Sequence, residues 1–247
     1  HYLAADAAAD ILKAGGNAVD AAVAAILVEG LVNPQMNSIG GECPMLICMA
    51  GENKVVAING NMAAPAAATP EAFRRRGHAQ VPDEGVLAAG VPGTPGALFA
   101  ALKNYGSMSF GEVAKAASRL ARAGWPLHCG VIGQEKFGLR DLQKKFLEKW
   151  PASAELYLTD GKVPIEGTLF RNPGLAAMLD QLAHAEHQAG GSRAEGIDAA
   201  FAEFYRGGIA FEMARFHSLQ MRFLDPGAGG PADARPHGFL RPDVAGA

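Results

Sequence analysis

The stretch that most constrains the fold covers residues 12–46, LKAGGNAVDAAVAAILVEGLVNPQMNSIGGECPML. A first helix is expected to end at Gly15-Gly16, because a residue without a β-carbon takes the left-handed cap conformation at no steric cost. Asn17 can then cap a second helix over residues 18–31, whose few charges require that protein cover most of its surface. Pro34 ends that helix, and a glycine pair leads into a strand over residues 45–50.

The composition argues against several classes of protein. With 247 residues, 49% of them hydrophobic, the chain can bury a core that fills one large domain or most of one. Its net charge of -3 gives no long-range attraction for nucleic acid, and the basic run at 74–76 is expected to be a solvated helix face. The longest apolar run, between Asp20 and Glu29, is far shorter than the ~20 residues that span a bilayer. We expect neither a nucleic-acid partner nor a membrane span.

The cysteines bear on the compartment. Cys43, Cys48 and Cys129 cannot all pair within the chain, and only the short reach of a strand separates the first two. A reducing compartment, the cytoplasm, is favoured slightly over the periplasm. The chain opens at His1 without a basic n-region and apolar h-region, so a signal peptide is either absent or already removed.

Turn and cap signals place the remaining elements. A turn at 51–54 predicts a hairpin, and the glycines and prolines of 90–96 predict an ordered loop without regular structure. Helices are expected after Thr69, over 110–123 behind a Ser109–Glu112 capping box, across much of 130–150, and over 173–189 behind Asn172. Residues 225–247, rich in glycine and proline, are expected to be irregular.

A series of short motifs runs along most of the chain. In order they are GGNAVDAAVA from Gly15, IGGECPML from Ile39, APAAATP at 64–70, GVPGT at 90–94, YG at 105–106, LARAGWP at 120–126, GTLFRNP at 167–173 and FYRG at 204–207. No single motif is decisive, but their order and spacing resemble those of the large subunit of the γ-glutamyltranspeptidase family.

The resemblance implies the αββα sandwich of the N-terminal nucleophile hydrolases, an α+β fold. Residues 1–247 would give the helix-rich large-subunit share of one domain, completed by a separate small subunit cut from the same precursor. In that family the nucleophile is the small subunit's terminal Thr, whose own α-amine acts as base. We therefore predict no catalytic residue, no metal and no cofactor in this chain, where the threonines lie in loops or caps: Thr69, Thr94, Thr159 and Thr168.

Two departures from the family pattern concern the substrate. Transpeptidases place an Arg-Glu pair just before the APAAAT-like segment, where the Arg clamps the α-carboxylate of a glutamyl substrate. Asn61 and Met62 stand there in this chain, so we predict that they line the substrate pocket without that clamp. Glu42-Cys43-Pro44 replaces two glycines and a Phe, which could reshape one wall of the pocket. Loop drift without effect on the substrate is the alternative for both changes.

A third departure is length. After residues 207–210 the family runs through a further helix and a Pro-rich stretch before its last helix, which here follows almost directly. Either a block is deleted between 209 and 217, or residues are missing there from the sequence. Missing residues would separate neighbouring Cα atoms by much more than ~3.8 Å.

Other patterns are weaker. His184 and His187 in HAEH miss both zinc-protease spacings, and 90–96 is not a dinucleotide fingerprint. No GxSxG elbow is present, and Cys43 is better interpreted as a small buried hydrophobe than as a nucleophile. The leading hypothesis is an amidohydrolase or acylase acting on a small-molecule amide, with water as acceptor, as in family members that act on oxamate-like amides or cephalosporin side chains. Genuine γ-glutamyl transfer and an inactive scaffold subunit are the alternatives.

Overall fold

The first two helices begin and end where the sequence places their caps. The computed structural model describes residues 1–133 and 137–224, starting with α1 (Tyr2–Lys13) and α2 (Ala18–Val32). The Asn17 side chain accepts hydrogen bonds from the backbone N–H groups of Val19 and Asp20, and the Asp20 carboxylate closes the capping box on Asn17 N. Gly15 has a φ of 93°, so it supplies the left-handed turn between the two helices.

A hairpin follows, as predicted. β1 (Met45–Met49) pairs antiparallel with β2 (Lys54–Ile58), with Ile47 opposite Val56. The other elements are η1 Ala50–Glu52, α3 Pro70–Arg75, η2 Val86–Ala88, α4 Thr94–Tyr105, α5 Phe110–Ala123, β3 Trp125–Pro126, α6 Cys129–Gly133, α7 Leu139–Lys149, α8 Pro151–Tyr157, β4 Leu169–Phe170, α9 Pro173–Ala189, α10 Arg193–Arg206 and α11 Gly208–Leu224.

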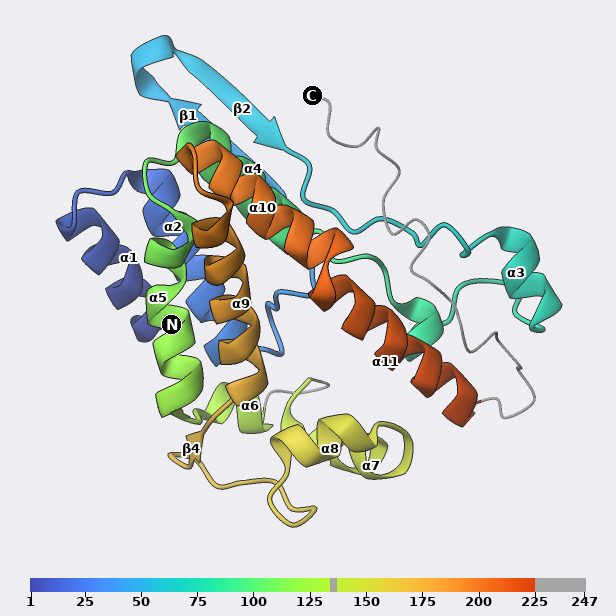
Figure 1. The fold of residues 1–247 in the computed structure, drawn as a ribbon. Coiled ribbons are helices and arrows are strands. Elements are labelled where there is room, and N and C mark those ends of the chain that lie inside the picture. Colours follow the sequence, from blue (N-terminus) through green and yellow to red (C-terminus); the bar gives the residue numbers. More distant parts are fainter. Residues whose placement is uncertain (134–136, 225–247) are drawn as a thin grey trace.

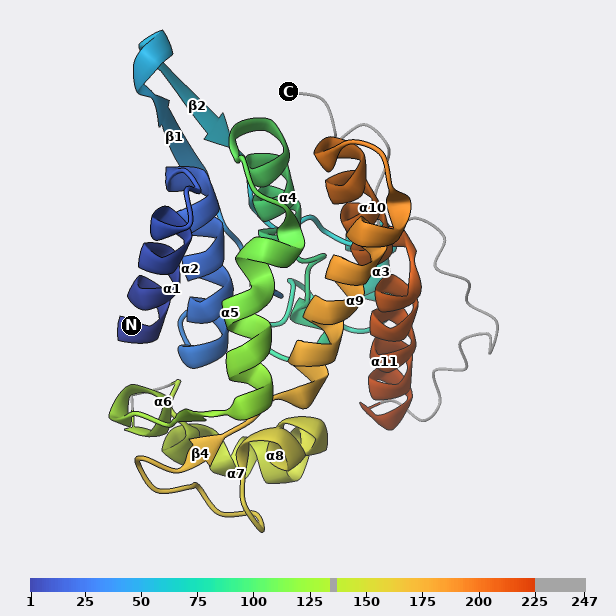
Figure 2. The same cartoon turned by 60° about the vertical axis from the view of Figure 1, so that its left-hand side comes forward.

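The helices form a layer, and the hairpin projects from one end of it. α1, α2, α5 and α9 lie side by side, and α10 packs on α9 (Figure 2). α4 lies against both α2 and α10, while α6, α7 and α8 gather at the end opposite the hairpin (Figure 1). The core between these helices is aliphatic and aromatic, and includes fully buried Trp125, Phe110 and Phe204. No helix among the described residues is both long enough and apolar enough to cross a membrane.

Capping predictions for α5 and α9 are confirmed to the residue. Ser109 and Glu112 form the reciprocal capping box of α5, and Asn172 accepts a hydrogen bond from Leu175 N at the start of α9. A second carboxylate reinforces α5, because Glu186 of α9 accepts from the N–H groups of Phe110 and Gly111 at 2.7 and 2.8 Å. A negative charge stabilises the N-terminus of a helix, where the helix dipole is positive, so this contact fixes α9 against α5.

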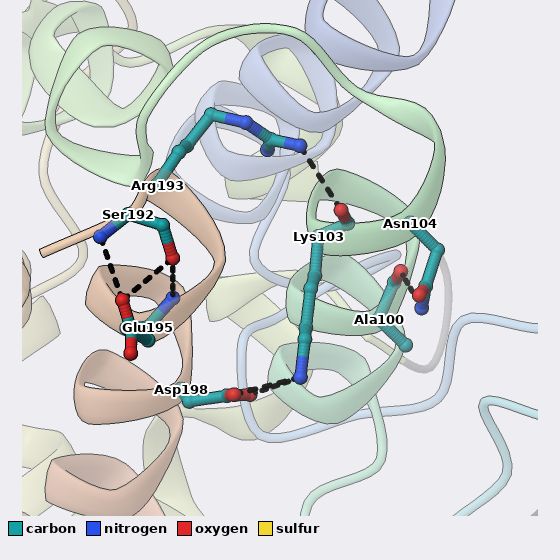
Figure 3. Close-up of polar contacts among 7 residues, drawn as sticks. All are labelled: Ala100, Lys103, Asn104, Ser192, Arg193, Glu195 and Asp198. Atoms are coloured by element: carbon teal, nitrogen blue, oxygen red, sulfur yellow. Dashed lines mark hydrogen bonds and ion pairs between the residues drawn. The ribbon is translucent and has the colours of Figure 1, made fainter.

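Polar contacts tie α10 to the C-terminal half of α4. Figure 3 shows Lys103 reaching Asp198, with its Nζ 2.8 and 2.7 Å from the two carboxylate oxygens. Arg193 donates to the carbonyl groups of Leu102 and Lys103 in the last turn of α4, of which Leu102 O also accepts from the C-cap Gly106 N. These contacts set where α10, and with it Tyr205, stands relative to α4.

One prediction for the loop at 90–96 is wrong. The segment does not stay irregular, because α4 begins at Thr94 with Pro95 in its first turn. Proline is well tolerated there, since the N–H that it lacks has no partner within the helix.

Two predictions for the C-terminal part remain predictions. The window 209–217 lies inside the continuous helix α11, and a lost block there stays a prediction. The irregular structure expected for 225–247 falls outside the described residues.

Candidate functional site

Three segments far apart in the sequence meet beside the N-terminus of α4. They are the glycine turn at 40–44, the segment at 59–63 that follows β2, and the loop at 90–94. Cys43 N donates to Gly60 O at 2.9 Å, and Ala63 forms an isolated antiparallel bridge with Val91. We call these three segments together the wall. Asn61 and Met62 belong to its middle segment.

Glycine is required where the wall segments cross. A β-carbon on Gly60 would lie 2.0 Å from the carbonyl oxygen of Cys43, and one on Gly93 would lie 2.3 Å from Gly60 O. Both obstacles are backbone atoms, which cannot rotate away as a flexible side chain can. The two glycines therefore allow a backbone approach that any larger residue would prevent.

The N-terminus of α4 holds the glycine turn. The carbonyl oxygen of Gly41 accepts from Gly93 N and from Thr94 N, each at 3.0 Å. The Thr94 side chain is buried, and its hydroxyl lies against a cavity of about 10 Å³ without a hydrogen-bond partner. That volume holds roughly one water, so Thr94 does not face a substrate.

Tyr205 clamps the same helix end from α10. Its hydroxyl accepts from Gly96 N at 2.8 Å and donates to Pro92 O at 2.7 Å. Burial raises the pKa of Tyr205 to about 12, against the opposing hydrogen bond from Gly96. The phenol therefore keeps its proton and can donate to Pro92 at any pH well below 12.

Asn61 and Met62 lie exposed on the wall and carry no charge. The Asn61 side-chain amide donates to Asn59 Oδ1 at 2.8 Å, and the Asn61 N–H donates to the same oxygen at 3.2 Å. Met62 is 40% exposed, which is high for an apolar side chain of its size. Its N–H donates to Glu42 Oε1 at 3.0 Å, so the first and middle wall segments are joined by a carboxylate.

The Cys and Thr side chains considered as nucleophiles occupy positions that a structural role explains. Burial raises the pKa of the Cys43 thiol, which lowers its thiolate fraction. Thr69 caps α3, and Thr159 forms a bridge with Lys162. His184 and His187 both lie on α9, and the described residues hold no group of three or more His, Cys, Asp or Glu side chains able to hold a metal ion.

Comparison with known proteins decides the family. The family model described as gamma-glutamyltranspeptidase matches residues 4–220. The chain belongs to the γ-glutamyltranspeptidase family. It is 31% identical over 85% of its length to the glutathione hydrolase proenzyme of Bacillus subtilis (strain 168). It is 32% identical over 87% of its length to the oxamate amidohydrolase proenzyme of Klebsiella pneumoniae.

Solved structures of other proteins share the fold. A structure of LmbA2991 superposes with a TM-score of 0.80 at 36% identity, covering 87% of this chain and 36% of that one. Cephalosporin acylase from Bacillus halodurans superposes at 0.74 with 30% identity, covering 87% and 37%. The helix-rich α+β fold of the N-terminal nucleophile hydrolases, predicted from the motifs, is confirmed. The chain spans 33% and 38% of the two curated relatives above, as expected of a large-subunit portion.

The sequence did not predict two contacts of the wall, one made by Tyr205 of α10 and one made by Glu42. Tyr205 lies in the FYRG motif, which marks the family without indicating that its phenol reaches α4, 109 positions earlier in the chain. Glu42 stood out as a departure from glycine, but its bond to Met62 N depends on a fold that brings residues 20 apart together.

Proposed function

We propose that this chain is the large-subunit part of an amide hydrolase whose nucleophile is the N-terminal Thr of a small subunit cut from the same precursor. The Thr hydroxyl oxygen attacks the amide carbonyl while the α-amine takes its proton. The C–N bond then breaks, the amine leaves with that proton, and water hydrolyses the acyl-enzyme ester. Supporting this reaction class, the curated relatives are a glutathione hydrolase and an oxamate amidohydrolase.

The observation that carries the substrate proposal is the neutral pair Asn61–Met62 on the wall. A glutamyl α-carboxylate is best held by an arginine, whose planar guanidinium donates two parallel hydrogen bonds. Asn61 donates its amide N–H to Asn59 instead, and Met62 has no polar side-chain group. The chain therefore fits an amidohydrolase or acylase whose acyl group is held by contacts other than that clamp.

The β1–β2 hairpin presents an exposed apolar face that a small subunit would bury. The strand register places Leu46, Cys48, Val55 and Ala57 on one face. All four are exposed, with Leu46 at 78% and Val55 at 64%. A contiguous apolar face on a two-stranded sheet with open edges is typical of a surface buried by another polypeptide. Burial of this face would also fix the wall, since residues 59–63 follow β2 directly.

Asn61→Arg tests the pocket. In the matured two-subunit protein, we expect this variant to gain hydrolysis of a γ-glutamyl p-nitroanilide, because the new guanidinium can pair with the α-carboxylate. A charge-assisted bidentate contact is worth roughly 1.5–3 kcal/mol, or about 10- to 150-fold in kcat/KM. Asn61→Gln is the control, since it lengthens the side chain without adding charge. No gain with arginine, or an equal gain with glutamine, would contradict the assignment of Asn61 to the pocket.

Each of the two alternative functions predicts one observation that the proposed amide hydrolase does not. A genuine γ-glutamyltransferase, as the identity to glutathione hydrolases allows, would already cleave the γ-glutamyl anilide as wild type and transfer the acyl group to an added dipeptide. An inactive scaffold subunit would have a companion polypeptide that does not begin with Thr. Sequencing the N-terminus of the companion chain separates the scaffold from both enzymes.

A further inference from the structure

We propose that Glu42 sets the charge preference of the pocket, so that the enzyme selects amides whose acyl group carries a cationic group, such as an ammonium. This inference rests on the proposed function, because it assumes that the wall at Asn61 and Met62 faces the substrate. It names the class of acyl group that the site takes.

The position of the carboxylate is fixed by the wall itself. Glu42 Oε1 accepts from Met62 N at 3.0 Å, which places the charged group beside the backbone of the residue that follows Asn61. On either side of Glu42, Gly41 is held by α4 and Cys43 is bonded to Gly60. The backbone that carries the carboxylate is therefore anchored at both neighbours, while its side chain stays exposed.

The charge has no counter-ion within the described part of the chain. None of the ion pairs between described residues includes Glu42. Oε1 is used by Met62 N, whereas no hydrogen bond is present at Oε2, which can accept from an incoming donor. An exposed carboxylate with one free oxygen attracts an ammonium group and repels a second carboxylate.

Attraction and repulsion together produce selectivity. At the wall the arginine that would hold a carboxylate is replaced by neutral Asn61, and the added charge next to it is negative. Specificity is a difference between affinities, and a like charge against the wrong substrate contributes as much as an opposite charge toward the right one. The same wall therefore disfavours acyl groups whose only charge is a carboxylate, such as glutaryl, because they lack the arginine partner and are repelled by Glu42.

Three p-nitroanilides of matched length test the charge preference in the matured enzyme. They carry 4-aminobutanoyl, pentanoyl and glutaryl groups, which place an ammonium, a methyl and a carboxylate at equivalent positions. Each exposed charge contact is worth up to about fivefold. We expect wild type to cleave the ammonium substrate about tenfold better than the carboxylate substrate in kcat/KM, with most of the difference in KM.

Glu42→Gln is the deciding variant. Its amide oxygen can still accept from Met62 N, so the wall keeps its bond while the charge is removed. We expect the ratio between ammonium and carboxylate substrates to fall to within about twofold, with the neutral substrate changed by less than twofold. Glu52→Gln on the exposed hairpin tip, a control that removes the same charge far along the strand, should leave the ratio at the wild-type value.

The outcomes separate the two proposals. If wild type cleaves none of the three anilides, the amide-hydrolase proposal fails, and this inference fails with it. If wild type is active and Glu42→Gln retains the wild-type ratio, or if Glu52→Gln shifts the ratio equally, the proposed function stands and the role of Glu42 is wrong.

Discussion

Asp20 is a buried charge that joins two elements of the helical layer. Its side chain is fully buried, and both carboxylate oxygens are used by donors from two separate segments. Asn17 N donates at 2.8 Å from the same helix end, while Ser107 N, Ser107 Oγ and Met108 N donate from the turn between α4 and α5. The carboxylate thus joins the start of α2 to the turn that leads into α5.

We predict that Asp20→Asn destabilises the protein by about 3 kcal/mol. The amide keeps one acceptor oxygen, but its NH₂ group faces N–H donors and cannot bond them. At least two donors that point at the buried Asp20 carboxylate lose a charged partner, and each such loss costs roughly 1–3 kcal/mol. The turn is also too crowded to rearrange, because a β-carbon on Gly106 would already lie 2.6 Å from Asp20 Oδ1.

The effect depends on pH with a defined sign. Burial alone would raise the pKa of Asp20, but hydrogen bonds from the Ser107 side chain and from the backbone at Asn17, Met108 and Ser107 together lower it. A carboxyl whose pKa is lower in the folded state stabilises the fold above its unfolded pKa, roughly 3.9, and loses that contribution as the pH falls through the folded value. The gap between wild type and Asp20→Asn should therefore narrow below about pH 4.

Urea unfolding at pH 7, followed by circular dichroism, measures the difference, and hydrogen exchange of the peptide covering 106–110 localises it. Asp198→Asn is the control, because its ion pair with Lys103 is exposed and worth less than about 1 kcal/mol. A loss below about 0.5 kcal/mol for Asp20→Asn, or a loss equal to that of the control, would refute the reasoning.

Two further predictions concern the wall. Tyr205→Phe removes the hydroxyl that bridges the partly buried Gly96 N–H and Pro92 C=O, so we expect a loss of about 2 kcal/mol in urea unfolding and a KM raised several-fold; unchanged stability and KM would contradict the clamp. Gly93→Ala places a β-carbon 2.3 Å from Gly60 O and should cost more than about 2 kcal/mol. Gly51→Ala, with nothing within 4 Å, should stay within about 0.5 kcal/mol of wild type in the same measurement.

The sequence predicted those elements whose signals are local. Ser109 and Glu112 lie one turn apart, and Asn172 directly precedes Pro173, so neighbouring residues alone fix the starts of α5 and α9. α4 was missed because its first turn is completed by a distant partner, the carbonyl of Gly41, which accepts from Gly93 N and Thr94 N. A loop rich in glycine and proline looks irregular until the segment that bonds to it is known.

The candidate site divides in the same way. Asn61 and Met62 could be found from their position before APAAATP, because a motif match fixes alignment along the chain. The partners of these residues could not be found from sequence, because Glu42 and Met62 are 20 positions apart and only the fold brings them together. Cys48 and Val55 show a similar limit, because alternation along a strand predicts two faces without saying which face another polypeptide covers.

Contacts at the C-terminal end of α4 help to position the wall at its N-terminal end. Arg193 and Lys103–Asp198 hold α10 on α4, Tyr205 then fixes the first turn of α4, and that turn holds Gly41. Each link is a hydrogen bond or ion pair that joins one helix to the next or to the glycine turn. No flexible loop lies between these links to absorb a shift of α10, so we expect the shift to move the glycine turn as well. Changes at the α10–α4 contact are thus expected to alter substrate KM without touching a residue of the wall, whereas changes on exposed α3, which contributes no bond to this chain of contacts, should not.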